Sequence, residues 1–160
     1  MTTSKEIEER IYSTFSEVAS SIGYSPLHGK IIGVLLVKSE PTSLQDLAKE
    51  TGYSASMISL SIDFLEVLGV VKKVKKTGDR KLYLSLHGDL LEALKTAIVL
   101  RTSKSIKTSL TGFEEAKKDL KDISSTGKDK ERIVNTIDVL EKEIKRLDKY
   151  MNILSKIRLP

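Results

Sequence analysis

The highest density of charge in this chain lies between Lys72 and Lys81. Six cations and one carboxylate fall within these ten positions, so the segment carries +5, which equals the net charge of the whole 160-residue chain. The charged residues are Lys72, Lys73, Lys75, Lys76, Asp79, Arg80 and Lys81. Such a cluster can bind nucleic-acid phosphates, and an Arg within it can enter a narrowed minor groove. The alternative is a solvated edge hairpin that its lysines keep from aggregating.

Apolar residues of high β-propensity flank this basic cluster on both sides. They are Val70, Val71, Val74, Leu82, Leu84 and Leu86. Thr77-Gly78-Asp79 between them is typical of a turn, because Gly tolerates a positive φ that other residues resist. We therefore expect two strands joined by a projecting basic hairpin.

Two short helices are predicted immediately before the hairpin. Thr42 or Ser43 can cap the first, Gly52 ends it, and Ser54 is the natural N-cap of the second. The second helix has an inward stripe at helical spacing, made of Ile58, Ile62, Leu65 and Gly69. Two helices around a turn that contains Gly have the spacing of a helix-turn-helix, whose second helix enters the major groove of DNA.

The opposite face of this second helix is the candidate for reading DNA. Its candidate contacts are Ser54, Ala55, Ser56, Ser59 and Leu60. The face carries no Lys or Arg and does carry Asp63, which argues against guanine recognition by a bidentate Arg. The Ser59 hydroxyl could still bond a phosphate or a base edge.

Residues 29 to 86 resemble the MarR superfamily of winged-helix regulators, in particular its GbsR-like branch. The similarity rests on Gly29-Lys30-Ile31, Ser43-Leu44 with Leu47-Ala48, Ser54-x-x-x-Ile58-Ser59, Leu65-x-x-Leu68-Gly69-Val70-Val71 and, most specifically, Gly78-Asp79-Arg80-Lys81-x-Tyr83. The resemblance covers a little over a third of the chain.

The resemblance implies roles for individual residues. Ser54 to Asp63 would be the recognition helix, Arg80 the wing residue that enters the minor groove, and Asp79 its partner in a salt bridge. It also implies that a small-molecule effector can bind between the winged helix and a dimerisation layer and change the separation of the two recognition helices. The sequence itself names no ligand.

Apolar periodicity predicts helices on both flanks. A first helix is expected from about Ser4 to Ile22, and Ser25-Pro26 begins a second, which is apolar on nearly all sides and therefore buried. From Leu90 to Ile123 the pattern fits either one long helix or two segments broken near Thr111-Gly112. A clearer break follows at Ser124-Ser125-Thr126-Gly127.

The strongest periodicity lies between Lys128 and Ile157. Apolar residues alternate spacings of four and three there, the a/d pattern of a coiled coil over about three heptads. They are Ile133, Ile137, Leu140, Ile144, Leu147, Met151 and Leu154. The seam can be filled within the chain by the preceding helix or by a second copy. The DNA hypothesis favours a homodimer, since a two-fold dimer presents two recognition helices about 34 Å apart.

Little in the sequence supports catalysis or a bound cofactor. The absence of Cys excludes a thiolate zinc site, and His28 and His87 have no carboxylate at ligand spacing. Gly-rich phosphate loops and a nucleophile elbow are also absent. The amino terminus is polar and no apolar run approaches the ~20 residues that span a bilayer, so we expect a soluble, cytoplasmic protein that is not an enzyme.

These observations predict a mainly α fold with a small β-hairpin: a winged helix-turn-helix with a long helical dimerisation region. The expected divisions are an N-terminal helix at 1–24 that packs on the dimer layer, the winged helix-turn-helix DNA-binding domain at 25–87 and the helical, coiled-coil dimerisation region at 88–160. The predicted function is a homodimeric transcriptional regulator that binds a pseudo-palindromic site on double-stranded DNA. The alternatives are a winged-helix protein-interaction module and a non-specific architectural DNA-binding protein.

Overall fold

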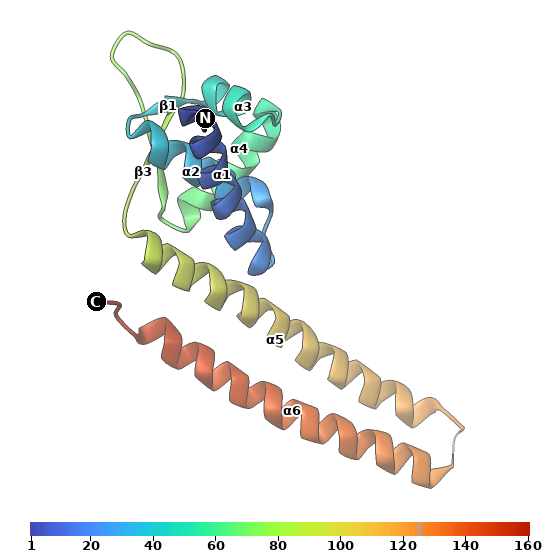
Figure 1. Cartoon of the computed structure of the whole chain (residues 1–160). Helices are drawn as coiled ribbons and strands as arrows, with labels where there is room; N and C mark the ends of the chain where they lie inside the picture. The colour runs from blue at the N-terminus through green and yellow to red at the C-terminus, as the bar shows by residue number, and fades with distance from the viewer. Residues whose placement is uncertain (125) are drawn as a thin grey trace. The chain divides into compact units, whose positions relative to one another are not determined.

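The computed structural model describes residues 1–124 and 126–160, which form two compact units, residues 1–97 and 98–160 (Figure 1). The elements, in chain order, are α1 (Ser4–Ser21), α2 (Pro26–Lys38), β1 (Thr42–Ser43), α3 (Leu44–Thr51), α4 (Ala55–Val67), β2 (Val71–Val74), β3 (Tyr83–Leu86), α5 (Leu90–Asp122) and α6 (Gly127–Lys156). The predicted mainly α fold with a small sheet is confirmed.

In the first unit, α1 and α2 lie close together because their contact contains Gly29. A Cβ atom at this position would overlap the backbone carbonyl of Phe15 in α1. The two helices begin where the sequence predicts, at Ser4 and at Pro26. Ser25 caps α2 with Pro26 at its first position, while Thr3 caps α1 in a reciprocal box with Glu6.

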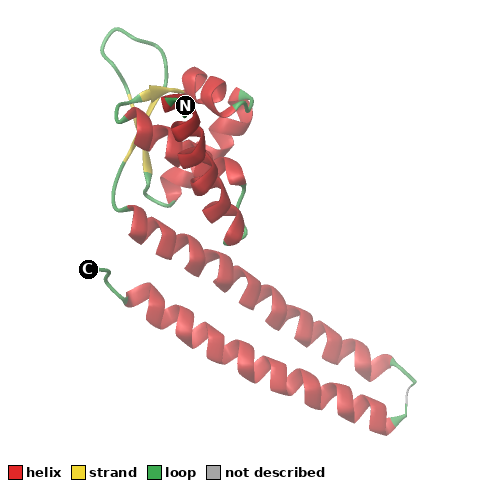
Figure 2. Ribbon diagram, viewed as in Figure 1, coloured by secondary structure: helices red, strands yellow, loops and turns green. Residues whose placement is uncertain are grey.

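The predicted hairpin strands β2 and β3 pair in antiparallel fashion, with Val71 opposite Leu86 and Val74 opposite Tyr83. The sheet has a third strand that the sequence did not reveal. β1 pairs with the other edge of β3 through Thr42 and Ser43, which gives the order β1-β3-β2 (Figure 2). Two residues are too few to show a strand periodicity, and their pairing partner lies about forty positions further along the chain.

The core of this unit joins the helices to the sheet. Its side chains include Ile31 and Leu35 of α2, Leu47 of α3, Ile58, Ile62 and Leu65 of α4, and Val71 and Leu84 of the sheet, each at most 2% exposed. The predicted inward stripe is confirmed for Ile58, Ile62 and Leu65, whereas Gly69 is exposed and lies beyond the end of α4 with a φ of 77°. Burial of that stripe fixes which face of α4 remains at the surface.

In the second unit, α6 runs beside the later part of α5 as a helical hairpin (Figure 1). Lys117 links the two helices, with its Nζ 2.7 Å from Asp138 Oδ1 and 3.1 Å from Glu141 Oε1.

α5 is continuous through Gly112, so one long helix is present and not two segments. The break predicted at 124–127 is present, because α5 ends at Asp122 and α6 begins at Gly127. Ser125, which belongs to the predicted break, falls outside the described residues. Within the described ranges, none of the helices combines the length and apolarity needed to cross a membrane.

Candidate nucleic-acid interface

Helices α3 and α4 form the predicted helix-turn-helix. Ser43 caps α3, with its Oγ accepting the Asp46 N–H at 3.1 Å. Gly52 ends this helix with a φ of 75°, a value that Gly adopts without steric cost. Ser54 then caps α4 by accepting the Met57 N–H at 3.3 Å. The local caps therefore set where the candidate recognition helix begins.

The outward face of α4 carries hydroxyls and apolar side chains. Ser56 and Ser59 are exposed, and Leu60 is 74% and Met57 47% exposed. The Ser54 hydroxyl is occupied as the cap and lies 3.1 Å from the Ser56 hydroxyl. In the described chain Ser59 has no hydrogen-bond partner, so its hydroxyl is free to bond a ligand.

The wing is the loop of residues 75–82 between β2 and β3. The predicted turn is present, since the Asp79 N–H donates to the Lys76 carbonyl at 3.1 Å and Gly78 has a φ of 78°. Five exposed cations of the hairpin have no carboxylate within 4.0 Å in residues 1–124 and 126–160: Lys72, Lys75, Lys76, Arg80 and Lys81.

Lys73 differs from the other cations of the hairpin. Its Nζ lies 3.0 Å from Asp63 Oδ1 and 3.1 Å from Glu66 Oε2, both on α4. The hydrogen bonds to Asp63 and then to Glu66 raise the pKa of Lys73 above its ordinary value. Lys73 was predicted to hold a phosphate, but in this structure its ammonium group pairs with the two carboxylates of α4 and ties β2 to that helix.

Asp79 organises the wing differently from what the resemblance implied. Its carboxylate accepts the Lys81 N–H at 2.9 Å and the Tyr83 hydroxyl at 2.7 Å. Both bonds lower the pKa of Asp79, and the bond from the Lys81 N–H has the larger effect. The implied salt bridge to Arg80 was wrong, because no Asp79–Arg80 ion pair occurs among the described residues. The Arg80 guanidinium is left free for an external anion.

Tyr83 was not predicted as a site residue and holds two parts of the wing. Besides the bond to Asp79, its ring lies 4.0 Å from Lys76 Nζ in a cation–π contact. The Asp79 bond raises the pKa of the Tyr83 hydroxyl, so the hydroxyl keeps its proton and donates. The spacing Asp79-x-x-x-Tyr83 is present in the sequence, but only the folded turn brings the two side chains together.

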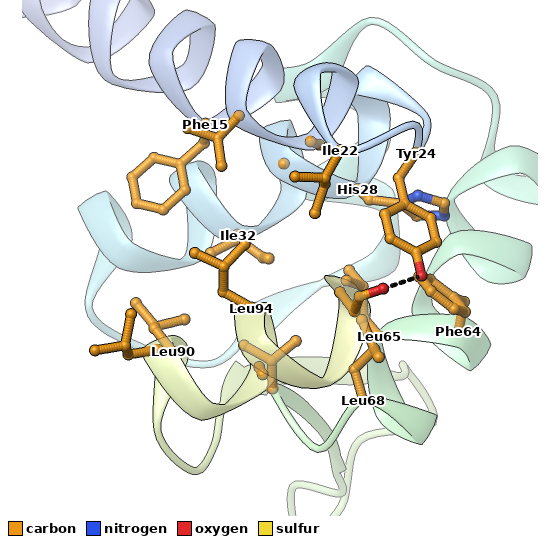
Figure 3. Close-up of a pocket in the computed structure, with 17 residues that line it drawn as sticks. Phe15, Ile22, Tyr24, His28, Ile32, Phe64, Leu65, Leu68, Leu90 and Leu94 are labelled. Carbon is orange, nitrogen blue, oxygen red and sulfur yellow. Dashed lines mark hydrogen bonds between the residues drawn. The ribbon is translucent and has the colours of Figure 1, made fainter. Parts of the chain in front are cut away.

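A largely apolar cavity of about 280 Å³ lies within residues 1–97. Its lining includes Phe15 of α1, Ile32 of α2, Phe64 of α4 and Leu94 of α5, which Figure 3 labels. His28 Nδ1 is buried there without a hydrogen-bond partner in the described residues. Burial lowers the pKa of His28, which favours the neutral imidazole.

The cavity wall also contains the Tyr24 hydroxyl, which already has a hydrogen-bond partner. The Tyr24 hydroxyl donates to the Ala97 carbonyl at 2.7 Å, as the dashed line in Figure 3 marks. The rings of Tyr24 and Phe64 both pack near His28, with centroids 6.2 and 4.9 Å from the imidazole. The structure thus makes His28 part of the cavity wall.

The heptad residues of α6 are only partly covered within one chain. Ile137 is 7% exposed, and Ile106 of α5 is 4% exposed. Ile133, Leu140 and Leu147 remain 40%, 44% and 36% exposed. Ile144, Met151 and Leu154 are half-buried. The seam thus retains apolar surface after the α5–α6 pairing.

No protein-family model and no curated protein matches this chain. Among solved structures it is similar to a transcriptional regulator at 19% identity and a TM-score of 0.56, over 94% of this chain and 99% of that one. A Staphylococcus aureus MepR variant bound to an oligodeoxyribonucleotide is similar at 14% identity and a TM-score of 0.44, over 85% of this chain and 91% of that one. The Listeria monocytogenes repressor MarR is similar at 22% identity and a TM-score of 0.39, over 86% of each chain.

The fold assignment rests on the first of these similarities together with the geometry above. A helix-turn-helix followed by a two-stranded wing, with a third short strand on the sheet, defines a winged helix. In this chain a long helical hairpin follows it.

Proposed function

We propose that this chain is a sequence-specific DNA-binding transcriptional regulator of the MarR superfamily, GbsR-like in its wing motif, that acts as a homodimer on a pseudo-palindromic operator. The observation that carries the proposal is the wing. Five exposed cations without carboxylate partners in the described chain project beside a helix whose outward face is also exposed. A polyanion is the ligand that this charge arrangement fits.

The proposal gives each part of the interface a role. The first turns of α4, from Ser54 to Leu60, enter the major groove, and Arg80 enters the adjacent minor groove. The lysines of the hairpin contact phosphates: Lys72, Lys75, Lys76 and Lys81. Lys73 contributes less to this binding because its charge is shared with Asp63 and Glu66.

The homodimer is supported by the uncovered heptad positions of α6. Leu140 and Leu147 lie on the seam and remain substantially exposed in a single chain. A second copy would bury them in a bundle of four helices, and the part of α6 from Ile133 to Lys156 is roughly 36 Å long at 1.5 Å per residue. That length suffices to join two protomers.

An effector is supported by the cavity in the first unit. Its wall is almost wholly apolar, and among the described residues that line it His28 Nδ1 is the buried side-chain polar atom without a hydrogen-bond partner. The matching ligand is a small apolar molecule with a single hydrogen-bonding group. Phenol should therefore raise the melting temperature more than toluene does, and His28→Leu should remove the difference.

The central experiment is selection of bound sequences from a random duplex pool, followed by measurement of affinity as a function of salt. We expect an inverted repeat to emerge. Lys75→Ala should weaken all sequences alike and reduce the salt slope by about one. Arg80→Ala should also relax the A·T preference at the minor-groove positions. Lys149→Ala, an exposed lysine of α6, is the matched control and should leave both quantities unchanged.

Two outcomes would replace the proposal. If random duplex competes as well as any selected sequence at physiological salt, the protein is an architectural binder, a reading that the lack of Lys and Arg on the outward face of α4 favours. If no duplex binds even at low salt, the winged helix is a protein-interaction module.

A further inference from the structure

The candidate recognition face carries a strongly exposed leucine. Leu60 is 74% exposed, and at 3.6 residues per turn it lies about 160° around the helix from both Ile58 and Ile62, which are buried. Met57, one turn earlier, is 47% exposed on the same side. The centre of this face is therefore apolar, although the face belongs to the most basic part of the molecule.

We propose that Leu60, assisted by Met57, recognises thymine methyl groups in the major groove, so that the half-site is rich in A·T pairs. This inference rests on the proposed DNA-binding function and specifies what α4 reads. Thymine is the base that presents a methyl group in the major groove, and apolar side chains discriminate it by contact. The outward face holds no Lys or Arg to pair with guanine O6 and N7.

The charges around Leu60 favour DNA over an apolar protein partner. Asp63 lies one turn after Leu60 and would repel phosphates, but the Lys73 ammonium group pairs with it at 3.0 Å, and also with Glu66, which weakens that repulsion. The unpaired cations of the wing lie on the hairpin that Lys73 ties to α4. An apolar centre with a cationic flank matches base edges flanked by phosphates.

Ser59 completes the recognition surface. Its hydroxyl has no partner in the part of the chain that the structure describes, and it precedes Leu60 on the exposed side of α4. A hydroxyl can donate to or accept from any base edge, so it adds affinity with little choice of base. Discrimination between thymine and the other bases is thus assigned to Leu60 and Met57.

The test removes single methyl groups from the DNA. In a duplex carrying the selected operator, each thymine of one half-site is replaced in turn by deoxyuridine, which keeps the base pair and deletes the 5-methyl group. For the unmodified protein we expect affinity to fall roughly fourfold at one or two positions, the factor expected for one buried methyl-sized group. Other positions should not respond.

Protein variants then assign the effect to a side chain. Leu60→Ala should bind thymine and uracil duplexes equally at the sensitive position, and Met57→Ala should reduce the difference. Val67→Ala is the matched control. Val67 is 78% exposed on the same helix about 10 Å further along, and the variant should keep the full thymine preference. All three sites are surface positions, and unchanged melting temperatures would confirm folding.

The outcomes are distinguishable from failure of the proposed function. If duplex DNA is not bound at all, the proposed function fails and this inference fails with it. If DNA is bound but no specific sequence is selected, the sequence-specific function fails and this inference fails with it. If specific binding shows no response to uracil at any position, the thymine-methyl inference alone is overturned. It is also overturned if Leu60→Ala keeps the thymine preference.

Discussion

Tyr83 gives an exposed loop a defined conformation. Its hydroxyl donates to Asp79 on one side of the wing, and its ring supports the Lys76 ammonium group. Asp79 in turn accepts the Lys81 N–H, so the residues on both sides of Arg80 are held. Preorganisation of this kind reduces the entropy that must be lost when a side chain enters a groove.

Tyr83→Phe keeps the ring and removes the hydroxyl that bonds Asp79. We expect weaker operator binding, by roughly threefold, because one hydrogen bond that orders the wing is lost. Fluorescence anisotropy with a labelled operator measures the affinity, and Tyr150→Phe on α6 is the control. Equal affinity of Tyr83→Phe and the unmodified protein would show that the bond does not order the wing.

His28 links stability to pH. Burial lowers its pKa in the folded protein, whereas the unfolded chain takes up a proton near the ordinary value of about 6.5. The unfolded state therefore binds more protons in this range. Stability is fully present above about pH 6.5 and is lost as the pH falls towards the folded-state pKa.

We expect the melting temperature to decrease between pH 7.5 and pH 5, and His28→Leu to flatten this decrease because the titrating group is gone. Circular dichroism at a series of pH values measures both curves. The exposed His87 provides the control variant His87→Gln, whose curve should run parallel to that of the unmodified protein. A His28→Leu curve as steep as the unmodified one would assign the pH dependence to other groups.

At the scale of elements, the contact between α1 and α2 depends on the missing side chain of Gly29. Because a Cβ there meets the backbone of α1 and not a flexible side chain, the contact cannot relax by a rotamer change. The close approach positions α1 over α2 and, with it, the wall of the cavity at Phe15.

Gly29→Ala should destabilise the protein by about 2–3 kcal/mol, as expected for overpacking against backbone. Gly112→Ala in α5 is a control of opposite sign. A Cβ at Gly112 meets no atom within 4 Å, so the variant should be roughly 0.5–1 kcal/mol more stable through helix propensity. Urea unfolding followed by circular dichroism measures both. A neutral Gly29→Ala would mean that the helices separate without cost.

At the scale of the whole molecule, the proposed DNA-binding function needs two copies. A single winged helix reads few base pairs. In the proposed dimer the exposed heptad residues of α6 would supply the interface. The proposed assembly therefore joins the two observations, since the same helices that bury apolar surface would fix the spacing of the two recognition helices.

The double substitution Leu140→Lys and Leu147→Lys should convert a dimer into a monomer, because two cations per chain would face the symmetry-related seam. Native mass spectrometry reports the mass against the 17.8 kDa chain, and circular dichroism checks that the helices persist. The exposed polar Asn152 offers the control Asn152→Lys, which should remain dimeric. If the unmodified protein is already a monomer, the symmetric-operator proposal fails.

Short-range patterns in the sequence were sufficient to determine most elements of this protein. Several features depend only on residues a few positions apart and can therefore be recognised without knowledge of the fold. They are the caps at Ser25 and Ser54, the helix end at Gly52 and the buried stripe from Ile58 to Leu65. The turn at Gly78 was predictable for the same reason. The choice between one and two helices around Gly112 stayed open, since a single Gly weakens a helix without ending it.

Tertiary structure alone decided the features that join distant segments. The pairing of β1 with β3, the ion pair between Asp63 and Lys73 and the cavity around His28 each bring together residues from separate elements. Asp79 turned towards Tyr83 instead of Arg80 because of how the loop folds over the start of β3. The physical reason is common to all four: a side chain's partner is set by distances in three dimensions, which sequence spacing does not specify beyond a helical turn or a tight loop.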